Sequence, residues 1–203
     1  MNYLIVGLGN IGREYADTRH NIGFIVLDAL AKASNTSFTT LRYGALAEVK
    51  MCGKQVYLLK PSTYMNLSGK AVHYWLREEH IPLEHLLIVV DDIALPFGTV
   101  RMRKQGSDGG HNGLWSIQQV LETMEYARLR VGIGDHFGKG QQIDYVMGAW
   151  DEDEQKELPF VFDKTIEAIR LFVLQGVERA MNKSNTTTHR NDVVVEKSDD
   201  SAE

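Results

Sequence analysis

The sequence predicts a single α/β domain, and three observations support this. Apolar runs of strand length alternate with stretches of helical apolar spacing along most of the chain. The 203 residues, of which 43% are hydrophobic, suit one domain with a sizeable core. No internal repeat divides the chain into smaller units. We therefore expect one domain over residues 1–182, followed by a tail.

The composition limits the class of protein. A lone Cys52 excludes an internal disulfide framework and a multi-cysteine metal site, and it favours a reducing compartment, so we expect a cytoplasmic protein. The apolar run at residues 4–6 is too short for a signal peptide, and no stretch reaches membrane-spanning length. The formal net charge of −5 gives no global sign of a polyanionic partner. A nucleic-acid site would therefore have to be a local basic patch.

The N-terminal stretch predicts a central strand and a ligand site. Residues 3–6 are apolar, partly β-branched and bounded by glycine. The glycines at 7–12 match the G-x-G-x-x-G pattern of dinucleotide-binding proteins. That site requires a helix that opens at the glycines and an acid about twenty residues on, at the end of the next strand. Here a polar loop follows, helical spacing starts only near His20, and Asp28 lies inside that helix, so we disfavour a dinucleotide site.

The middle of the chain continues the alternation of strands and helices. Strands are expected where apolar runs end at glycine, proline or acids, and helices where apolar residues recur at three to four positions. The expected elements are a hairpin of residues 43–51 and 54–60, a loop over 60–66, a helix over 67–80, a strand over 86–90, a strand over 97–104, a loop over 105–110, a helix over 111–122 and a strand over 127–134.

The last third of the chain predicts a closing helix and a polar tail. Residues 135–142 are rich in glycine, charge and amide, which is typical of a mobile loop. Residues 156–181 carry the apolar spacing of a helix. Residues 183–203 contain few apolar groups, so we expect a disordered tail.

Polar side chains follow the predicted strands at their carboxyl ends, where open α/β sheets bind ligands. They are Asn10, His20, Asn66, Asp91, His111 and Asn112. A histidine beside a carboxylate, without a serine or cysteine nucleophile in these loops, suits general-base activation of water. Side-chain amides offer donors to a developing oxyanion and acceptors to backbone N–H groups, which suits an acyl or peptide substrate. Taken singly, each residue also has a structural explanation: His20 could cap a helix and Asp91 could pair with a lysine.

Five motifs in the same order resemble those of bacterial-type peptidyl-tRNA hydrolases. They are G-L-G-N-I-G at 7–12 with Tyr15 and R-H-N-I-G at 19–23, K-P-x-x-Y-M-N-x-S-G at 60–69, D-D at 91–92 with L-P-x-G at 95–98, G-G-H-N-G at 109–113, and R-L-R-x-G-I-G at 128–134. The resemblance implies a compact, monomeric α/β domain of the phosphorylase/hydrolase-like type, with a twisted mixed β-sheet flanked by helices. It also implies hydrolysis of the ester that joins a peptide to the 3′-terminal ribose of tRNA, which recycles tRNA, with neither a metal nor a cofactor.

The resemblance also implies roles for single residues. His20 would be the general base, Asp91 its partner, and Asn10 would position the ester carbonyl or its water. Asn66 and Asn112 would hold the peptide backbone and stabilise developing charge. Groove-lining roles would fall to Tyr15, Met65 and His111, although core packing is an alternative for Met65.

A basic strip is expected to bind the tRNA. It consists of Arg101, Arg103, Lys104, Arg128 and Arg130. Strand side chains alternate with a period of two, so the arginines of each pair share a face. The alternative is that these residues only solvate one face of the sheet.

The sequence departs from the family pattern at three places. Ala94 stands where an acid is common, residues 105–108 contain less glycine and add an acid, and Trp115 replaces a commonly basic residue. We expect these changes to reshape the tRNA contact without altering the chemistry.

Two other functions fit parts of the sequence. A non-catalytic scaffold of the same fold could hold RNA or peptide without turnover, but the retained His20, Asp91 and Asn10 argue against it. A hydrolase of small acyl esters would need the same base and amides, but it would not need the basic strip.

Overall fold

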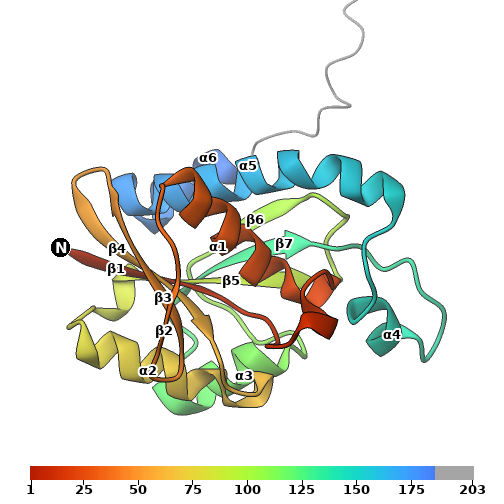
Figure 1. The fold of residues 1–203 in the computed structure, drawn as a ribbon, viewed down its shortest axis with the longest axis horizontal. Coiled ribbons are helices and arrows are strands. Elements are labelled where there is room, and N and C mark those ends of the chain that lie inside the picture. Colours follow the sequence, from red (N-terminus) through yellow and green to blue (C-terminus); the bar gives the residue numbers. More distant parts are fainter. Residues whose placement is uncertain (186–203) are drawn as a thin grey trace, which may run out of the picture.

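The computed structural model describes residues 1–185, which form one mixed α/β domain (Figure 1). The strands are β1 (Asn2–Gly7), β2 (Thr39–Leu41), β3 (Gly44–Met51), β4 (Lys54–Pro61), β5 (Leu86–Asp92), β6 (Val100–Arg103) and β7 (Ala127–Gly132). The α-helices are α1 (Ile22–Ala33), α2 (Ser68–Glu78), α3 (Asn112–Leu121), α4 (Gln142–Val146), α5 (Glu152–Gln175) and α6 (Val177–Ser184). The predicted fold class is confirmed.

The strands form one sheet in the order β2-β3-β4-β1-β5-β7-β6. The central strands β4, β1, β5 and β7 run parallel, whereas β2, β3 and β6 pair with their neighbours in antiparallel fashion. Parallel strands bring their carboxyl ends to one edge of a sheet. The loops that leave β1, β4 and β5 therefore meet at the same edge, where α/β proteins place their ligand sites.

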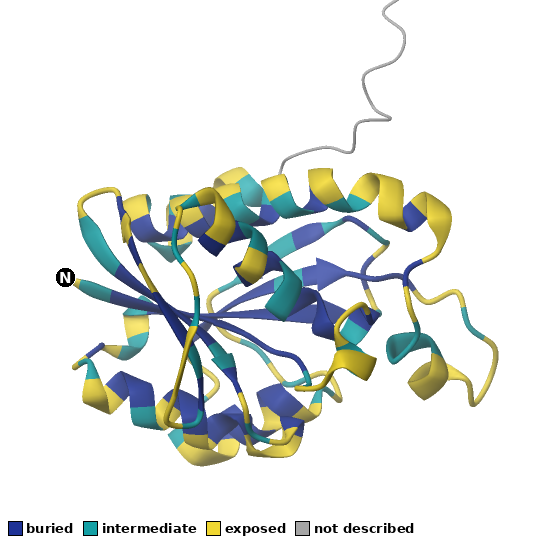
Figure 2. Ribbon diagram, in the orientation of Figure 1, coloured by how far each residue is buried: buried dark blue, intermediate teal, exposed yellow. Residues whose placement is uncertain are grey.

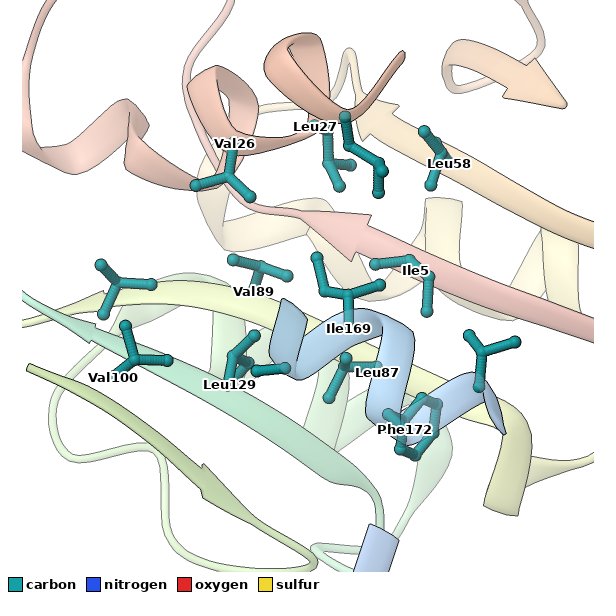
Figure 3. Close-up of a cluster of buried hydrophobic side chains, with 14 of the residues drawn as sticks. Ile5, Val26, Leu27, Leu58, Leu87, Val89, Val100, Leu129, Ile169 and Phe172 are labelled. Carbon is teal, nitrogen blue, oxygen red and sulfur yellow. The ribbon is translucent and has the colours of Figure 1, made fainter. Parts of the chain in front are cut away.

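Helices cover both faces of the sheet. α1, α5 and α6 lie on one face, and α2 and α3 lie on the other (Figure 1). The central strands are buried on both sides, as Figure 2 shows, and this explains why their sequences are continuously apolar. Figure 3 shows the core between the sheet and the first of these layers, where Ile5 and Leu87 of the sheet lie near Ile169 of α5.

Two glycines let the start of α1 approach the end of β1 closely. A Cβ atom on Gly7 would lie 2.2 Å from the carbonyl oxygen of Gly23, and one on Gly23 would lie 2.5 Å from the backbone nitrogen of Leu8. A side chain at either position would force the helix away from the strand. The glycines thus place the turn before α1, which carries His20, at the carboxyl edge of the sheet.

The end of the chain differs from the prediction. The helix expected over residues 156–181 starts earlier, at Glu152, because Asp151 caps it there. It is also divided in two, since Gly176 adopts φ 82° and ψ 169°, which no helix contains. Apolar spacing does not reveal such a break, because the buried face resumes immediately afterwards.

The expected tail boundary also moves. α6 runs to Ser184, and the side chain of Asn185 exchanges two hydrogen bonds with the backbone of Met102 in the edge strand β6 (2.8 and 3.0 Å). Residues 183–185 therefore belong to the domain, and the rest of the predicted tail lies outside the described residues.

Three smaller differences lie at the sheet and the last loop. The short β2 was not expected, β6 covers only half of the strand predicted over 97–104, and the loop predicted over 135–142 leads directly into α4. Within residues 1–185, no helix has the length and apolar character needed to cross a membrane.

Candidate active site

Two histidines flank one buried aspartate at the carboxyl edge of the sheet. His20 lies in the 3-10 turn before α1, Asp91 lies near the end of β5, and His111 is the N-cap residue of α3. The Nδ1 atom of His20 is 3.0 Å from Asp91 Oδ2, and the Nε2 atom of His111 is 3.0 Å from Asp91 Oδ1. The structure thus brings together three residues that lie far apart in the sequence.

Hydrogen bonds define which imidazole nitrogens carry protons. His111 Nδ1 accepts from the backbone N–H groups of Gly113 (3.1 Å) and Leu114 (3.4 Å), so its lone pair is used there. The proton of a neutral His111 is therefore on Nε2, which donates to Asp91. His20 likewise donates to Asp91 through Nδ1, and its Nε2 keeps a free lone pair. That nitrogen is the basic atom of the site.

The same contacts shift the pKa values of the acid and the base. Burial alone would raise the pKa of Asp91, but the imidazoles of His111 and His20 outweigh it and hold this pKa below its ordinary value. Burial acts to lower the pKa of His20, yet the charge and hydrogen bond of Asp91 prevail and raise it. Asp91 is thus an ionised carboxylate at neutral pH, and it makes His20 a stronger base.

The trio opens into a cleft with a volume of about 330 Å³. His20, Asp91 and His111 form part of its wall, and Asn112 and Arg130 line it as well. α4 and the residue after it also line this cleft, through Gln142, Ile143, Val146 and Met147. A substrate that entered this cleft would contact both the histidine–aspartate trio and α4.

Asn10 is held at the backbone, which leaves its side chain available. Its N–H donates to Asn21 Oδ1 (2.8 Å), and Asn21 Nδ2 donates back to the carbonyl of Asn10 (2.9 Å). The side-chain amide of Asn10 contacts the sulfur of Met147 at 4.0 Å. The role of Asn21 was not predicted, although its position directly after His20 was a usable signal.

The remaining predicted peptide contacts divide into exposed and buried residues. Asn66 and Asn112 are both exposed. They lie on neighbouring elements, since the turn that contains Asn66 packs on α3, which begins at Asn112. Met65 is 8% exposed, and a Cβ atom on Gly113 would lie 2.7 Å from its sulfur, so Met65 joins these elements. Tyr15 is half-buried and is not among the residues that line the 330 Å³ cleft.

The four predicted arginines share one sheet face but differ in burial. Arg101 pairs with Arg130, and Arg103 pairs with Arg128, across the antiparallel strands β6 and β7. Directly opposed residues point to the same side of a sheet. Arg101 and Arg103 are partly exposed, whereas Arg128 is only 2% exposed.

Arg128, for which the sequence predicts a tRNA contact, is held inside the protein. Its guanidinium donates to the carbonyl oxygens of Gly106 (2.6 Å), Ser107 (3.1 Å) and Met124 (3.0 Å). Burial lowers the pKa of this group. Both terminal nitrogens of the guanidinium are thus bonded to backbone carbonyls, and burial separates the group from the surface where a phosphate would bind. Arg128 instead holds the loop that leads to His111.

Two other predicted cations have acidic partners. Arg130 Nε lies 2.6 Å from Asp92 Oδ2, and Lys104 Nζ lies 2.7 Å from Glu178 Oε1 on the surface. The Arg130 side chain is still 33% exposed and lines the cleft. Trp115, one of the departures from the family pattern, is 50% exposed on α3.

His20, Asp91 and His111 also provide the residue types of a metal site. One ligand atom from each lies within 4.8 Å of the others. However, the imidazole nitrogens that face Asp91 are hydrogen-bond donors in this arrangement, and a metal ligand needs a free lone pair. In this arrangement the two imidazoles and the carboxylate form a hydrogen-bonded trio.

Comparisons with known proteins identify the family of this chain. A family model described as peptidyl-tRNA hydrolase matches residues 4–192. The chain is 56% identical over 186 residues to a peptidyl-tRNA hydrolase of Cytophaga hutchinsonii, covering 92% of this chain and 99% of that protein. It is 57% identical over 185 residues to one of Phocaeicola vulgatus, covering 91% and 99%. The crystal structure of peptidyl-tRNA hydrolase from Acinetobacter baumannii superposes with a TM-score of 0.84 at 35% identity, covering 91% of this chain and 94% of that chain. This chain therefore belongs to the peptidyl-tRNA hydrolase family.

Proposed function

We propose that this enzyme hydrolyses the ester between a peptide and the 3′-terminal ribose of tRNA, with His20 as the general base. Family membership and the identity to curated relatives support the reaction. The observation that carries the mechanism is the free Nε2 of His20, whose ring Asp91 holds and polarises through Nδ1. The products are free tRNA and free peptide.

The reaction takes place in two steps. His20 Nε2 removes a proton from water while the oxygen of that water attacks the ester carbonyl, and the carbonyl electron pair moves to its oxygen. The tetrahedral intermediate then collapses, the ribose oxygen leaves, and His20 returns the proton to it. The imidazolium formed between the steps is stabilised by Asp91. A positioned general base of this kind is worth ~10²–10⁴ in rate.

Three side-chain amides bind the acyl part of the substrate in this proposal. Asn10 donates to the ester carbonyl and then to the oxyanion. Its backbone is fixed by Asn21, and its side-chain amide lies against Met147, a residue that lines the cleft. Asn112 lines the cleft, and Asn66 is exposed on the turn that packs on α3; both bind the backbone of the peptide through their donor and acceptor groups. Since these contacts involve only main-chain groups, they suit peptides of varied sequence.

The tRNA lies along the arginine face of β6 and β7. Arg101 and Arg103 are partly exposed there, and Arg130 continues the same face into the cleft. Lys104 adds charge at the end of the strand. Because these cations lie together on one face of the sheet, they offer tRNA a positive surface even though the protein has a net charge of −5.

The enzyme acts as a monomer in the cytoplasm in this proposal. His20, Asp91, His111 and the amides all come from one chain, so the site is complete without a partner. Within residues 1–185 no helix is suited to crossing a membrane.

Turnover of N-acetylated aminoacyl-tRNA by the purified protein tests the proposal. We expect release of free tRNA by the wild type and a loss of ~10²-fold or more in His20→Ala. Tight binding without turnover would instead identify a scaffold. Equal activity on small acyl esters, with no dependence on salt, would identify a general esterase.

A further inference from the structure

The residue that precedes the proposed base is a buried arginine with an extensive set of contacts. Arg19 Nη2 lies 2.7 Å from Glu154 Oε2, and Nε lies 3.3 Å from Glu154 Oε1. Nη1 donates to the carbonyl of Tyr145 at 3.2 Å. The guanidinium also lies 4.2 Å from the centre of the Tyr145 ring. Every nitrogen of this fork therefore has a partner inside the protein, and Arg19 is not among the residues that line the cleft.

Glu154 is fixed without help from Arg19. It lies in the first turn of α5, and its Oε2 accepts from the backbone N–H of Asp151 at 2.9 Å. Asp151 in turn accepts from the N–H of Glu154 at 2.8 Å, which completes a capping box. The carboxylate is therefore a rigid anchor, and the position of Arg19 follows from it.

The other end of the Arg19 network is α4, which lines the same cleft as His20. α4 has five residues, none of which is fully buried, and only Tyr145 and Val146 pack partly against the core. Polar bonds add to these contacts in holding the helix. The N–H of Arg19 donates to Gly148 (3.0 Å), Arg19 Nη1 donates to Tyr145, and the Tyr145 hydroxyl donates to Ile133 (2.6 Å). In Figure 1, α4 lies apart from the sheet and beside the turn before α1.

We propose that Arg19 is a positioning residue for ester hydrolysis, because its fork, anchored on Glu154, fixes the α4 wall relative to the turn that carries His20. The inference rests on the proposed function of the cleft. Met147, which directly follows α4, contacts Asn10, so displacement of α4 also alters the amide that is proposed to hold the ester. Loss of the fork thus separates the base from the surface that aligns the substrate.

Removing one partner of a buried ion pair leaves a charge without compensation. Three variants therefore test the pair together. Arg19→Lys keeps the charge but cannot bond both Glu154 oxygens and Tyr145. Glu154→Gln keeps the shape, and the double variant Arg19→Gln/Glu154→Gln contains no buried charge, so it remains informative if a single variant does not fold.

We expect each variant to lose at least tenfold in kcat on N-acetylated aminoacyl-tRNA when the assay temperature is well below the melting temperature of that variant. KM should change less, because the tRNA contacts on β6 and β7 are untouched. Backbone amides of residues 142–148 should exchange with deuterium at least tenfold faster than in the wild type. The double variant should lose no more kcat than Glu154→Gln, because Glu154→Gln already breaks the link that Arg19→Gln would remove.

The matched control is Ile169→Val, a fully buried change in α5 far along the helix from Glu154. It should lower the melting temperature but leave kcat and the exchange of residues 142–148 unchanged. The inference is overturned if the Arg19 and Glu154 variants keep wild-type kcat, or if they lose activity without faster exchange of α4. A wild type without turnover would refute the proposed function itself, and this result is distinct from either outcome.

Discussion

His111 donates a hydrogen bond from Nε2 to Asp91 while its Nδ1 accepts from the first turn of α3. One ring therefore ties the buried carboxylate to a helix terminus. Because Nδ1 is committed to the backbone, His111 is fixed as a donor to Asp91. The carboxylate receives its second donor from His20, and its charge is shared between the two rings.

Removing His111 should shift the titration of the base upward. In His111→Ala the charge of Asp91 acts on His20 alone, which favours the protonated imidazole and raises its pKa further. The acid limb of the kcat/KM profile should therefore move to higher pH, since the base must be neutral to act. Steady-state rates between pH 5 and 9 measure this, and an acid limb at the wild-type position would contradict the shared-charge arrangement.

Asp91→Asn should shift the same limb in the opposite direction. An amide carries no charge, so it no longer favours the imidazolium, and the raised pKa of His20 should fall. The amide oxygen must accept from His111 at the Oδ1 position, which places the NH₂ group against His20 Nδ1. This favours the His20 tautomer with its proton on Nε2, where no base remains.

We therefore expect a large fall in the plateau of kcat/KM for Asp91→Asn, together with an acid limb at lower pH. The same pH series that is used for His111→Ala serves as the comparison. A fall in rate with an unmoved acid limb would show that Asp91 does not set the pKa of His20.

The arginines of β6 and β7 should separate into substrate-binding and structural groups. Arg101→Gln and Arg103→Gln should each raise KM for peptidyl-tRNA and reduce the log–log salt slope by about 0.7–0.9 for each phosphate that the variant no longer neutralises. Hydrolysis of a minimal peptidyl-adenosine ester should change little in both variants. Equal losses on the two substrates would assign these residues to the chemistry or the fold.

Arg128→Gln should behave differently, because its guanidinium satisfies buried carbonyls. Leaving such groups without partners typically costs about 1–3 kcal/mol of stability for each group. We expect a lower free energy of unfolding with an unchanged salt slope. A changed slope in Arg128→Gln would show that the buried side chain reaches the tRNA.

The position of a C-terminal truncation should decide its effect. Removing residues after Asn185 should leave the melting temperature and turnover nearly unchanged, because that segment has few apolar residues to bury. A truncation that also removes Asn185 should be less stable by about 1–3 kcal/mol, since the edge strand loses two backbone hydrogen bonds. Thermal unfolding of the two truncated proteins gives the comparison, and equal melting temperatures would refute it.

The alternation of elements and the chemical types at the strand ends follow from the sequence alone. A continuously apolar run such as residues 86–90 predicts a strand that is buried on both faces, because the side chains on each side of such a strand lie against apolar neighbours. The sequence likewise predicts His20 as a general base with Asp91 as its partner. Their types and their positions after strands are local features.

Which groups face each other depends on the tertiary structure. Arg128 and Arg130 have the same local pattern, yet one is buried under the loop at 106–107 and the other lines the cleft, because only the packing of that loop distinguishes them. The link between Arg19 and Glu154 spans 135 residues, and no spacing rule connects positions so far apart. The hydrogen bonds that fix the protons of His111 and His20 likewise depend on how α3 begins and on where β5 ends. Such relations arise from the folded chain, since their energies come from contacts that the unfolded sequence does not contain.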